Sequence, residues 1–92
     1  MTYRIKVTES ARREYLHLPR SVQRLFQATL TELSRNPHRR TPDLDIHQLR
    51  GGRGLWTLRV GRYRGLYRIE GNCVVFVTFR LRPGAYKELE GI

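Results

Sequence analysis

Residues 55–70 read LWTLRVGRYRGLYRIE, and in this stretch apolar and aromatic residues alternate with arginines. Such alternation is typical of β-strands that bury one face. Gly61-Arg62 interrupts the pattern, and glycine readily takes the positive φ that a two-residue hairpin turn needs. The stretch therefore predicts two antiparallel strands, at about residues 54–60 and 63–70, and decides what kind of sheet the chain can form.

A turn at Gly61-Arg62 also fixes which residues of the two strands face each other. The predicted pairs are Val60 with Tyr63, Arg59 with Arg64, Leu58 with Gly65 and Trp56 with Tyr67. The face opposite the core then carries Thr57, Arg59, Arg64, Leu66 and Arg68. Like charges directly opposite each other cost about 0.2–1 kcal/mol, and a phosphate bridging two guanidinium groups converts that cost into affinity. The alternative is a solvated face on which the arginines splay apart.

The rest of the chain supplies two helices and two further strands. Residues 3–7 alternate as a strand, and Thr8 can cap a helix over residues 9–18. A second amphipathic helix follows from Pro19 or Ser21 to Asn36, where Asn36-Pro37 ends it. Residues 37–53 show no periodicity and are expected to form a surface connection. Gly71-Asn72 predicts a turn into a strand at about 73–80, and residues 85–90 a short final helix.

This order of elements predicts one domain, residues 1–92, of the α+β class. We expect a helical hairpin packed on one face of a mainly antiparallel four-stranded sheet, in the order β-α-α-β-β-β. Ninety-two residues allow one modest hydrophobic core.

The basic residues are concentrated between Leu49 and Tyr86, where eight arginines accompany one acid, Glu70. The arginines are Arg50, Arg53, Arg59, Arg62, Arg64, Arg68, Arg80 and Arg82. The whole chain carries a formal charge of +10, with sixteen arginines and two lysines. Arginine presents a planar, always-charged fork that suits phosphate. A genome-wide preference for arginine would explain the residue type but not its placement, so a polyanion, RNA first, is the expected partner.

Two candidate groups have an open role. Counting alternation through the second turn puts Arg80 on the helix-covered side, whereas a bulge or an early strand end would reverse its facing. His47 lies just upstream of the arginines and is either a proton-transfer group or a surface histidine.

Cysteine and histidine usage indicates a protein without metal or cofactor. Cys73 is the single cysteine, so no internal disulfide forms, and a reducing, cytoplasmic location is expected. His17, His38 and His47 lack the spacing of metal ligands. No apolar signal segment opens the chain and no apolar run reaches membrane-spanning length, so no membrane partner is expected.

Four segments carry a resemblance to a known family. They are MTYRIKV at residues 1–7 opening a β-α-α unit, Leu49-Arg50-Gly51, residues 55–69, and Gly84-Ala85-Tyr86-Lys87. Together they resemble the RelE/ParE toxin superfamily, and in particular its archaeal RelE branch. The most specific piece spans residues 58–67, and the resemblance covers nearly the whole chain.

The resemblance implies a type II toxin that acts as a ribosome-dependent endoribonuclease and cuts mRNA in the decoding site without a metal. The 2′-hydroxyl of the messenger attacks the adjacent phosphate, giving a 2′,3′-cyclic phosphate and a 5′-hydroxyl. The implied catalytic residues are Arg59, Arg64, Arg82 and Tyr86, and the RNA-binding residues are Arg50, Arg53, Thr57, Arg68 and Arg80. The implied partners are mRNA, the ribosome and an acidic RelB-like antitoxin that covers the basic face.

The chain also departs from the family pattern. Thr57 stands where a bacterial RelE places a lysine. The tail after the last predicted strand is short at Pro83-Gly84. Arginine does not readily give up a proton, so proton transfer is left to Tyr86 or His47. Two other functions stay open: a ParE-like toxin that acts on DNA gyrase without cleaving RNA, and a non-catalytic RNA- or ribosome-binding module.

Overall fold

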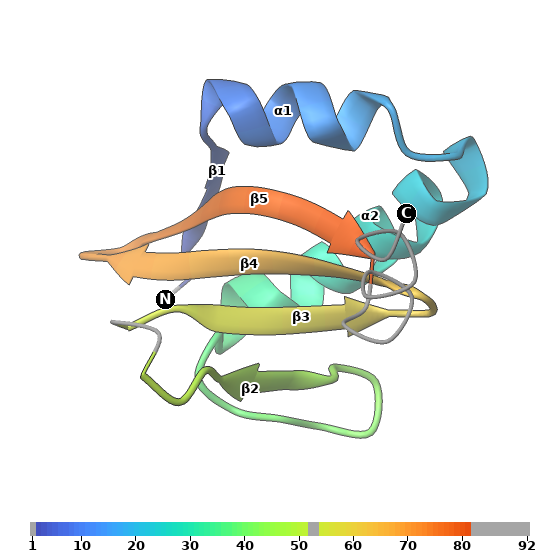
Figure 1. The fold of residues 1–92 in the computed structure, drawn as a ribbon. Helices are drawn as coiled ribbons and strands as arrows, with labels where there is room; N and C mark the ends of the chain where they lie inside the picture. Colours follow the sequence, from blue (N-terminus) through green and yellow to red (C-terminus); the bar gives the residue numbers. More distant parts are fainter. Residues whose placement is uncertain (1, 52–53, 82–92) are drawn as a thin grey trace.

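Two helices and five strands form the part of the chain that the computed structural model describes, residues 2–51 and 54–81 (Figure 1). In chain order they are β1 (Arg4–Val7), α1 (Glu9–Leu16), α2 (Arg20–Arg35), β2 (Ile46–Gln48), β3 (Trp56–Val60), β4 (Tyr63–Glu70) and β5 (Cys73–Leu81). The predicted final helix at 85–90 lies outside the described residues. None of the helices in the described ranges is long and apolar enough to cross a membrane.

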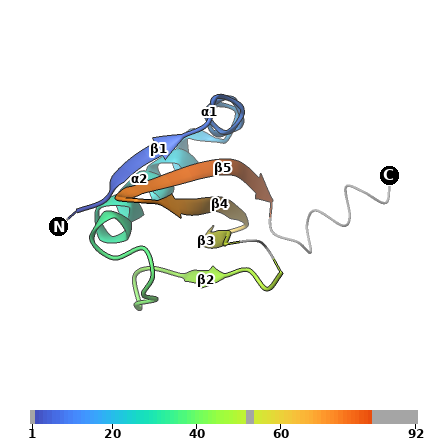
Figure 2. The ribbon, with the colours of Figure 1, turned by 90° about the vertical axis from the view of Figure 1, so that its left-hand side faces the viewer.

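The strands form one mixed sheet in the order β1-β5-β4-β3-β2. β1 pairs with β5 in parallel, and the other neighbours are antiparallel. Helix α2 lies behind the sheet in Figure 1 and beside it in Figure 2, while α1 runs along the β5 side. The predicted α+β class, a helical hairpin on a mainly antiparallel sheet, is confirmed.

The predicted number of strands, four, is wrong because residues 46–48 form a fifth. This short strand, β2, pairs Ile46 with Leu58 and His47 with Thr57 on β3. Ile46 is buried in the core, together with Leu44 just before it. Three residues give a single inward position, so no alternation is visible in the sequence, and the expected surface connection contains a strand.

The helix ends follow the local signals in the sequence. The Thr8 hydroxyl accepts a hydrogen bond from the backbone N–H of Ala11 at 3.1 Å and caps α1, as predicted. Helix α1 ends at Leu16, two residues before the predicted end, and α2 starts directly after Pro19. Asn36 is extended and ends α2, because a proline follows it.

The core lies between the helices and the sheet and is rich in aromatic side chains. Phe26 of α2 meets Phe79 of β5 edge-on at a ring-centroid distance of 5.2 Å, and Phe79 stacks with Phe76 at 5.1 Å. Tyr67 is fully buried, and its hydroxyl donates to the carbonyl oxygen of Pro37 at 2.8 Å. Burial raises the pKa of Tyr67, so this phenol stays protonated and serves the core.

The outer edge of β5 is covered in two different ways. β1 pairs with its first half, Cys73 to Phe76. Further along, the Glu14 carboxylate of α1 accepts hydrogen bonds from the Thr78 hydroxyl at 2.9 Å and the Phe79 backbone N–H at 3.3 Å. An uncovered edge N–H is a template for pairing with another chain, so Glu14 both fixes α1 and closes this edge.

Gly65 makes a close approach possible in the middle of the sheet. A Cβ atom placed on it would lie 2.8 Å from Cε1 of Phe76 and 3.0 Å from Cε1 of Phe79. We expect Gly65→Ala to lower the free energy of unfolding by about 1–3 kcal/mol, because the two packed rings must shift. Thermal or denaturant unfolding measures this change.

Gly71→Ala is the matched control for this substitution. Its added Cβ meets no atom within 4 Å, so the positive φ of 59° is the remaining source of strain, at about 1–2 kcal/mol. A Gly65→Ala protein as stable as the unsubstituted chain would contradict the packing described here.

Candidate functional site

The predicted β3–β4 hairpin register is confirmed pair by pair, with Arg59 opposite Arg64. On the other side of β4, Arg64 pairs with Arg80 of β5. Arg59, Arg64 and Arg80 therefore form one line across three neighbouring strands, which we call the arginine row. It crosses the sheet where β3 and β5 end and β4 begins, on the right in Figure 1.

A β-bulge decides the facing of Arg80. Leu66 pairs with Thr78 but Tyr67 pairs with Phe76, so Val77 is an extra residue in β5. The extra residue reverses the alternation, which puts Phe79 in the core and Arg80, exposed, on the opposite face. The simple count that placed Arg80 on the helix-covered side is wrong for this reason, and Arg80 joins Arg64 on the face away from α2.

Arg64 at the centre of the row is the least compensated of the three arginines. Its Nε atom is buried and has no hydrogen-bond partner. Burial lowers the pKa of the Arg64 guanidinium, and the positive charges of Arg80 and Arg59 lower it further. Among residues 2–51 and 54–81 no carboxylate lies within ion-pair distance of it. An anion at this position would relieve both the desolvation and the repulsion.

The two outer arginines, in contrast, are each linked to a carboxylate. Nε of Arg59 lies 3.8 Å from Oδ2 of Asp45, and Arg40 lies 3.4 Å from Oδ1 of the same side chain. Nε of Arg80 donates to the Thr78 hydroxyl at 3.2 Å, and that hydroxyl in turn donates to Glu14. These contacts hold the ends of the row in place, while the partly exposed, long Asp45–Arg59 pair is weak enough for a phosphate to displace.

The other described residues predicted to bind RNA are buried, paired with an acid or located away from the arginine row. Thr57 shares the face of the arginine row but is fully buried, so its hydroxyl lies beneath the surface. Arg68 lies on the same face and pairs with Glu70, which compensates its charge. Arg50 is exposed in the turn that follows β2. Arg53, Arg82 and Tyr86 lie outside the described residues.

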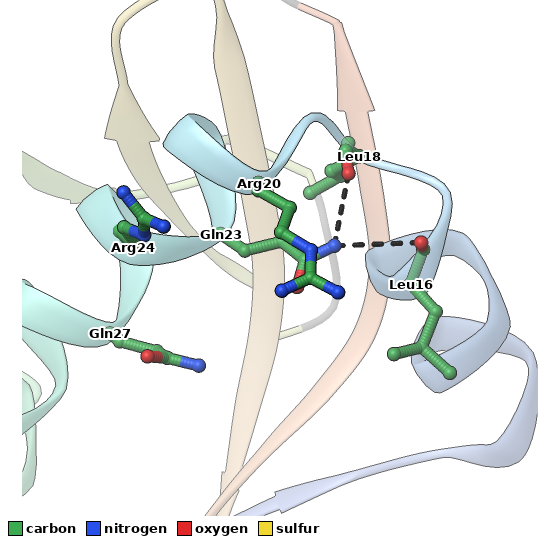
Figure 3. A pocket seen from close by; sticks show the side chains of 6 residues that line it. All are labelled: Leu16, Leu18, Arg20, Gln23, Arg24 and Gln27. Atoms are coloured by element: carbon green, nitrogen blue, oxygen red, sulfur yellow. Dashed lines mark hydrogen bonds between the residues drawn. The ribbon is translucent and has the colours of Figure 1, made fainter.

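Two hollows elsewhere on the molecule lack the groups for chemistry. One, of about 340 Å³, lies at the α1–α2 turn between Arg20, Arg24 and Gln23, whose amide donates to the Leu18 carbonyl at 2.9 Å (Figure 3). The other, of about 330 Å³, is an apolar groove between α1, α2 and the β1 edge. Neither is lined by a carboxylate, histidine or cysteine. Within the described ranges no three such residues cluster as metal ligands would.

Comparison with solved structures identifies the class of protein that has this fold. The chain is similar to the toxin in the RelBE2 toxin–antitoxin complex of Mycobacterium tuberculosis, with 30% identity, a TM-score of 0.74, and coverage of 89% of this chain and 100% of that one. The RelE–RelB complex of Pyrococcus horikoshii gives 25% identity and a TM-score of 0.75 over 90% and 98% of the two chains. A double mutant of Escherichia coli RelE in the free state shares the fold at 20% identity, with a TM-score of 0.74 over 98% and 94%.

The fold and these similarities identify the chain as a toxin of the RelE/ParE superfamily. More narrowly, residues 5–86 match the family described as the ParE toxin of the type II toxin–antitoxin system parDE, and the chain belongs to this family. Comparison with curated protein sequences gives no significant match.

Removing the carboxylate at the end of the row should strengthen the binding of a polyanion. We expect Asp45→Asn to tighten binding of a short single-stranded RNA about fivefold, because a unit charge near 4 Å from a guanidinium in water is worth about 1 kcal/mol. Fluorescence anisotropy at a fixed salt concentration measures the affinity.

Asp43→Asn serves as the control, since Asp43 is exposed and lies in the turn two residues before Asp45. The effect of Asp45→Asn should largely disappear in an Arg59→Ala background. Equal tightening by both substitutions would show that net charge alone sets the affinity, and that Asp45 has no special relation to the arginine row.

Removing the central cation should make the free protein more stable. We expect Arg64→Gln to raise the free energy of unfolding by about 0.2–1 kcal/mol in low salt, because it ends like-charge contacts on both sides. Denaturant unfolding at low and high ionic strength measures this, and salt should reduce the difference by screening. Arg62→Gln, in the exposed turn, should leave the stability unchanged. A less stable Arg64→Gln protein would argue against repulsion within the row.

Proposed function

We propose that this toxin is an endoribonuclease that cleaves mRNA on the ribosome, by attack of a ribose 2′-hydroxyl on the adjacent phosphate. The observation that supports this proposal most is the uncompensated guanidinium of Arg64 at the centre of the arginine row. A ribose-phosphate lying across β4 would bring its phosphate to Arg64, with Arg59 and Arg80 on either side. The charge that develops on the phosphorane then meets three cations that are already in place.

The described part of the site acts by positioning and electrostatic stabilisation. An arginine stays charged at neutral pH and does not exchange protons with the substrate. Binding on the ribosome would supply the substrate conformation in which the 2′-oxygen, phosphorus and 5′-oxygen lie in line. Arg82 and Tyr86 complete the proposed catalytic set on the strength of the family resemblance, and Arg50 and Arg53 belong to the proposed RNA path.

The same surface suits the partner that neutralises a toxin. The relatives from Mycobacterium tuberculosis and Pyrococcus horikoshii were solved as complexes with their antitoxins. A chain with a formal charge of +10 attracts an acidic protein strongly. We propose that an acidic antitoxin covers the arginine row and places a carboxylate where the RNA phosphate would lie.

A second candidate function has a specific observation in its favour, since the matching family model is that of ParE. A ParE-like toxin would act on DNA gyrase and would leave mRNA intact. Fold does not separate the two activities, because one scaffold can carry either site. The difference must therefore be measured as a reaction.

A translation extract tests the proposal directly. The purified chain should cleave a reporter mRNA at codon positions in the presence of ribosomes, with cuts mapped by primer extension. Arg64→Ala and Arg80→Ala should each lower the cleavage rate about 10²–10³-fold, the cost of removing one stabilising donor. Arg24→Ala, in the hollow of the helical hairpin, should retain the rate.

The outcomes separate the candidate functions. Intact mRNA together with inhibited supercoiling by gyrase would overturn the nuclease proposal and favour ParE-like action. RNA binding without cleavage or gyrase inhibition would indicate a binding module. Cleavage that survives Arg64→Ala would mean that the nuclease site lies elsewhere on the chain.

A further inference from the structure

The arginine row leaves one step of the proposed reaction without a group to perform it. The attacking 2′-hydroxyl must lose a proton as its oxygen bonds to phosphorus, and an arginine cannot accept it. A proton acceptor has to reach the same face of the sheet as the row, within hydrogen-bond reach of a bound ribose.

The short strand β2 brings one histidine to that face. Ile46 and its partner Leu58 are both buried in the core. Side chains alternate along a strand, so the next pair, His47 and Thr57, faces the other way, toward the side of the arginine row. His47 is level with Thr57, two residue positions along the strands from Arg59, and it is exposed. No hydrogen bond or ion pair occupies its ring within the described residues.

The other proton acceptors of the described chain are engaged or lie elsewhere. Nδ1 of His17 lies 2.7 Å from the Arg13 carbonyl oxygen on α1, and His38 packs edge-on against Trp56 on the core side. The Glu14 carboxylate accepts bonds from Thr78 and Phe79. Cys73 is at the start of β5, at the end of the strand away from Arg80.

Asp45 shares the face of His47, but its two oxygens already lie near the cations of Arg40 and Arg59. Asp45 is better placed to help His47: the imidazolium that forms when His47 takes a proton would lie on the same strand face as this negative charge. The positive charge of Arg59, on the neighbouring strand β3, counteracts the negative charge of Asp45.

We propose that His47 is the proton acceptor of the site, an inference that rests on the proposed endoribonuclease function. A neutral imidazole nitrogen takes the proton of the 2′-hydroxyl while the 2′-oxygen uses the freed electron pair to bond to phosphorus. The bond from phosphorus to the 5′-oxygen breaks, and this oxygen leaves with the electron pair and gains a proton from water. The products are a 2′,3′-cyclic phosphate and a 5′-hydroxyl, and His47 returns its proton to solvent.

Substitution of His47 combined with chemical rescue tests this inference. His47→Ala should lower the rate of mRNA cleavage in the ribosome assay about 10²–10⁴-fold, the usual contribution of a positioned acid or base. It should leave ribosome binding and the unfolding temperature unchanged, because the side chain is exposed. Imidazole added to the buffer should restore part of the rate to His47→Ala and none to Arg64→Ala. His17→Ala is the matched control and should retain full activity.

Failure of this inference can be told apart from failure of the proposed function. If the unsubstituted chain cleaves mRNA and His47→Ala cleaves it equally fast, His47 is not the acceptor and the endoribonuclease proposal stands. If His47→Ala loses activity without any rescue by imidazole, the side chain acts by binding or packing and the inference is overturned. If the unsubstituted chain leaves mRNA intact, both proposals fall together.

Discussion

Three arginines lie side by side in the sheet because strand pairing puts their α-carbons at one level. The Gly61-Arg62 turn sets Arg59 opposite Arg64, and the bulge at Val77 sets Arg80 beside Arg64 on the same face. Neighbouring strands are about 4.8 Å apart, so the three arginines leave the backbone at closely spaced, fixed points. The buried aromatic core under the row, built around Phe76 and Phe79, holds the sheet in this arrangement against their repulsion.

The positive charge of the row is compensated at its ends and not at its centre, and this distinguishes it from a uniform patch of surface charge. Asp45 lies near Arg59, and Glu14 is linked to Arg80 through Thr78, so both outer side chains have partners within the chain. Arg64 is held between them with a buried, unbonded nitrogen. Its desolvation is the unfavourable term that an anion can offset on binding. Donors that are already in place before the substrate binds lose less conformational entropy on binding. They also need no reorganisation when charge develops in the transition state.

The sequence predicted the hairpin and its register because glycine and alternation act over a few residues. Two features of the structure could not be predicted from the sequence, for physical reasons. The facing of Arg80 depends on Val77, an extra residue in β5 that local propensity does not mark; Phe76 and Phe79, before and after it, both pack close to Gly65. β2 has three residues and is stabilised by its partner β3, so no pattern of its own marks it. The shared face of His47 and the row therefore emerged from tertiary structure alone.

The shape of the row bears on the choice between RNA and a protein target. An acidic protein surface offers several carboxylates, which pair well with arginines that are free to move toward them. Here Arg59 lies near Asp45, Arg80 is bonded to the Thr78 hydroxyl, and Arg64 lies partly buried between them. This arrangement favours the proposed phosphate ligand, because one compact anion has oxygens that point to several sides. Its neighbour on the same face, an exposed imidazole, suits a substrate that carries a hydroxyl beside that phosphate.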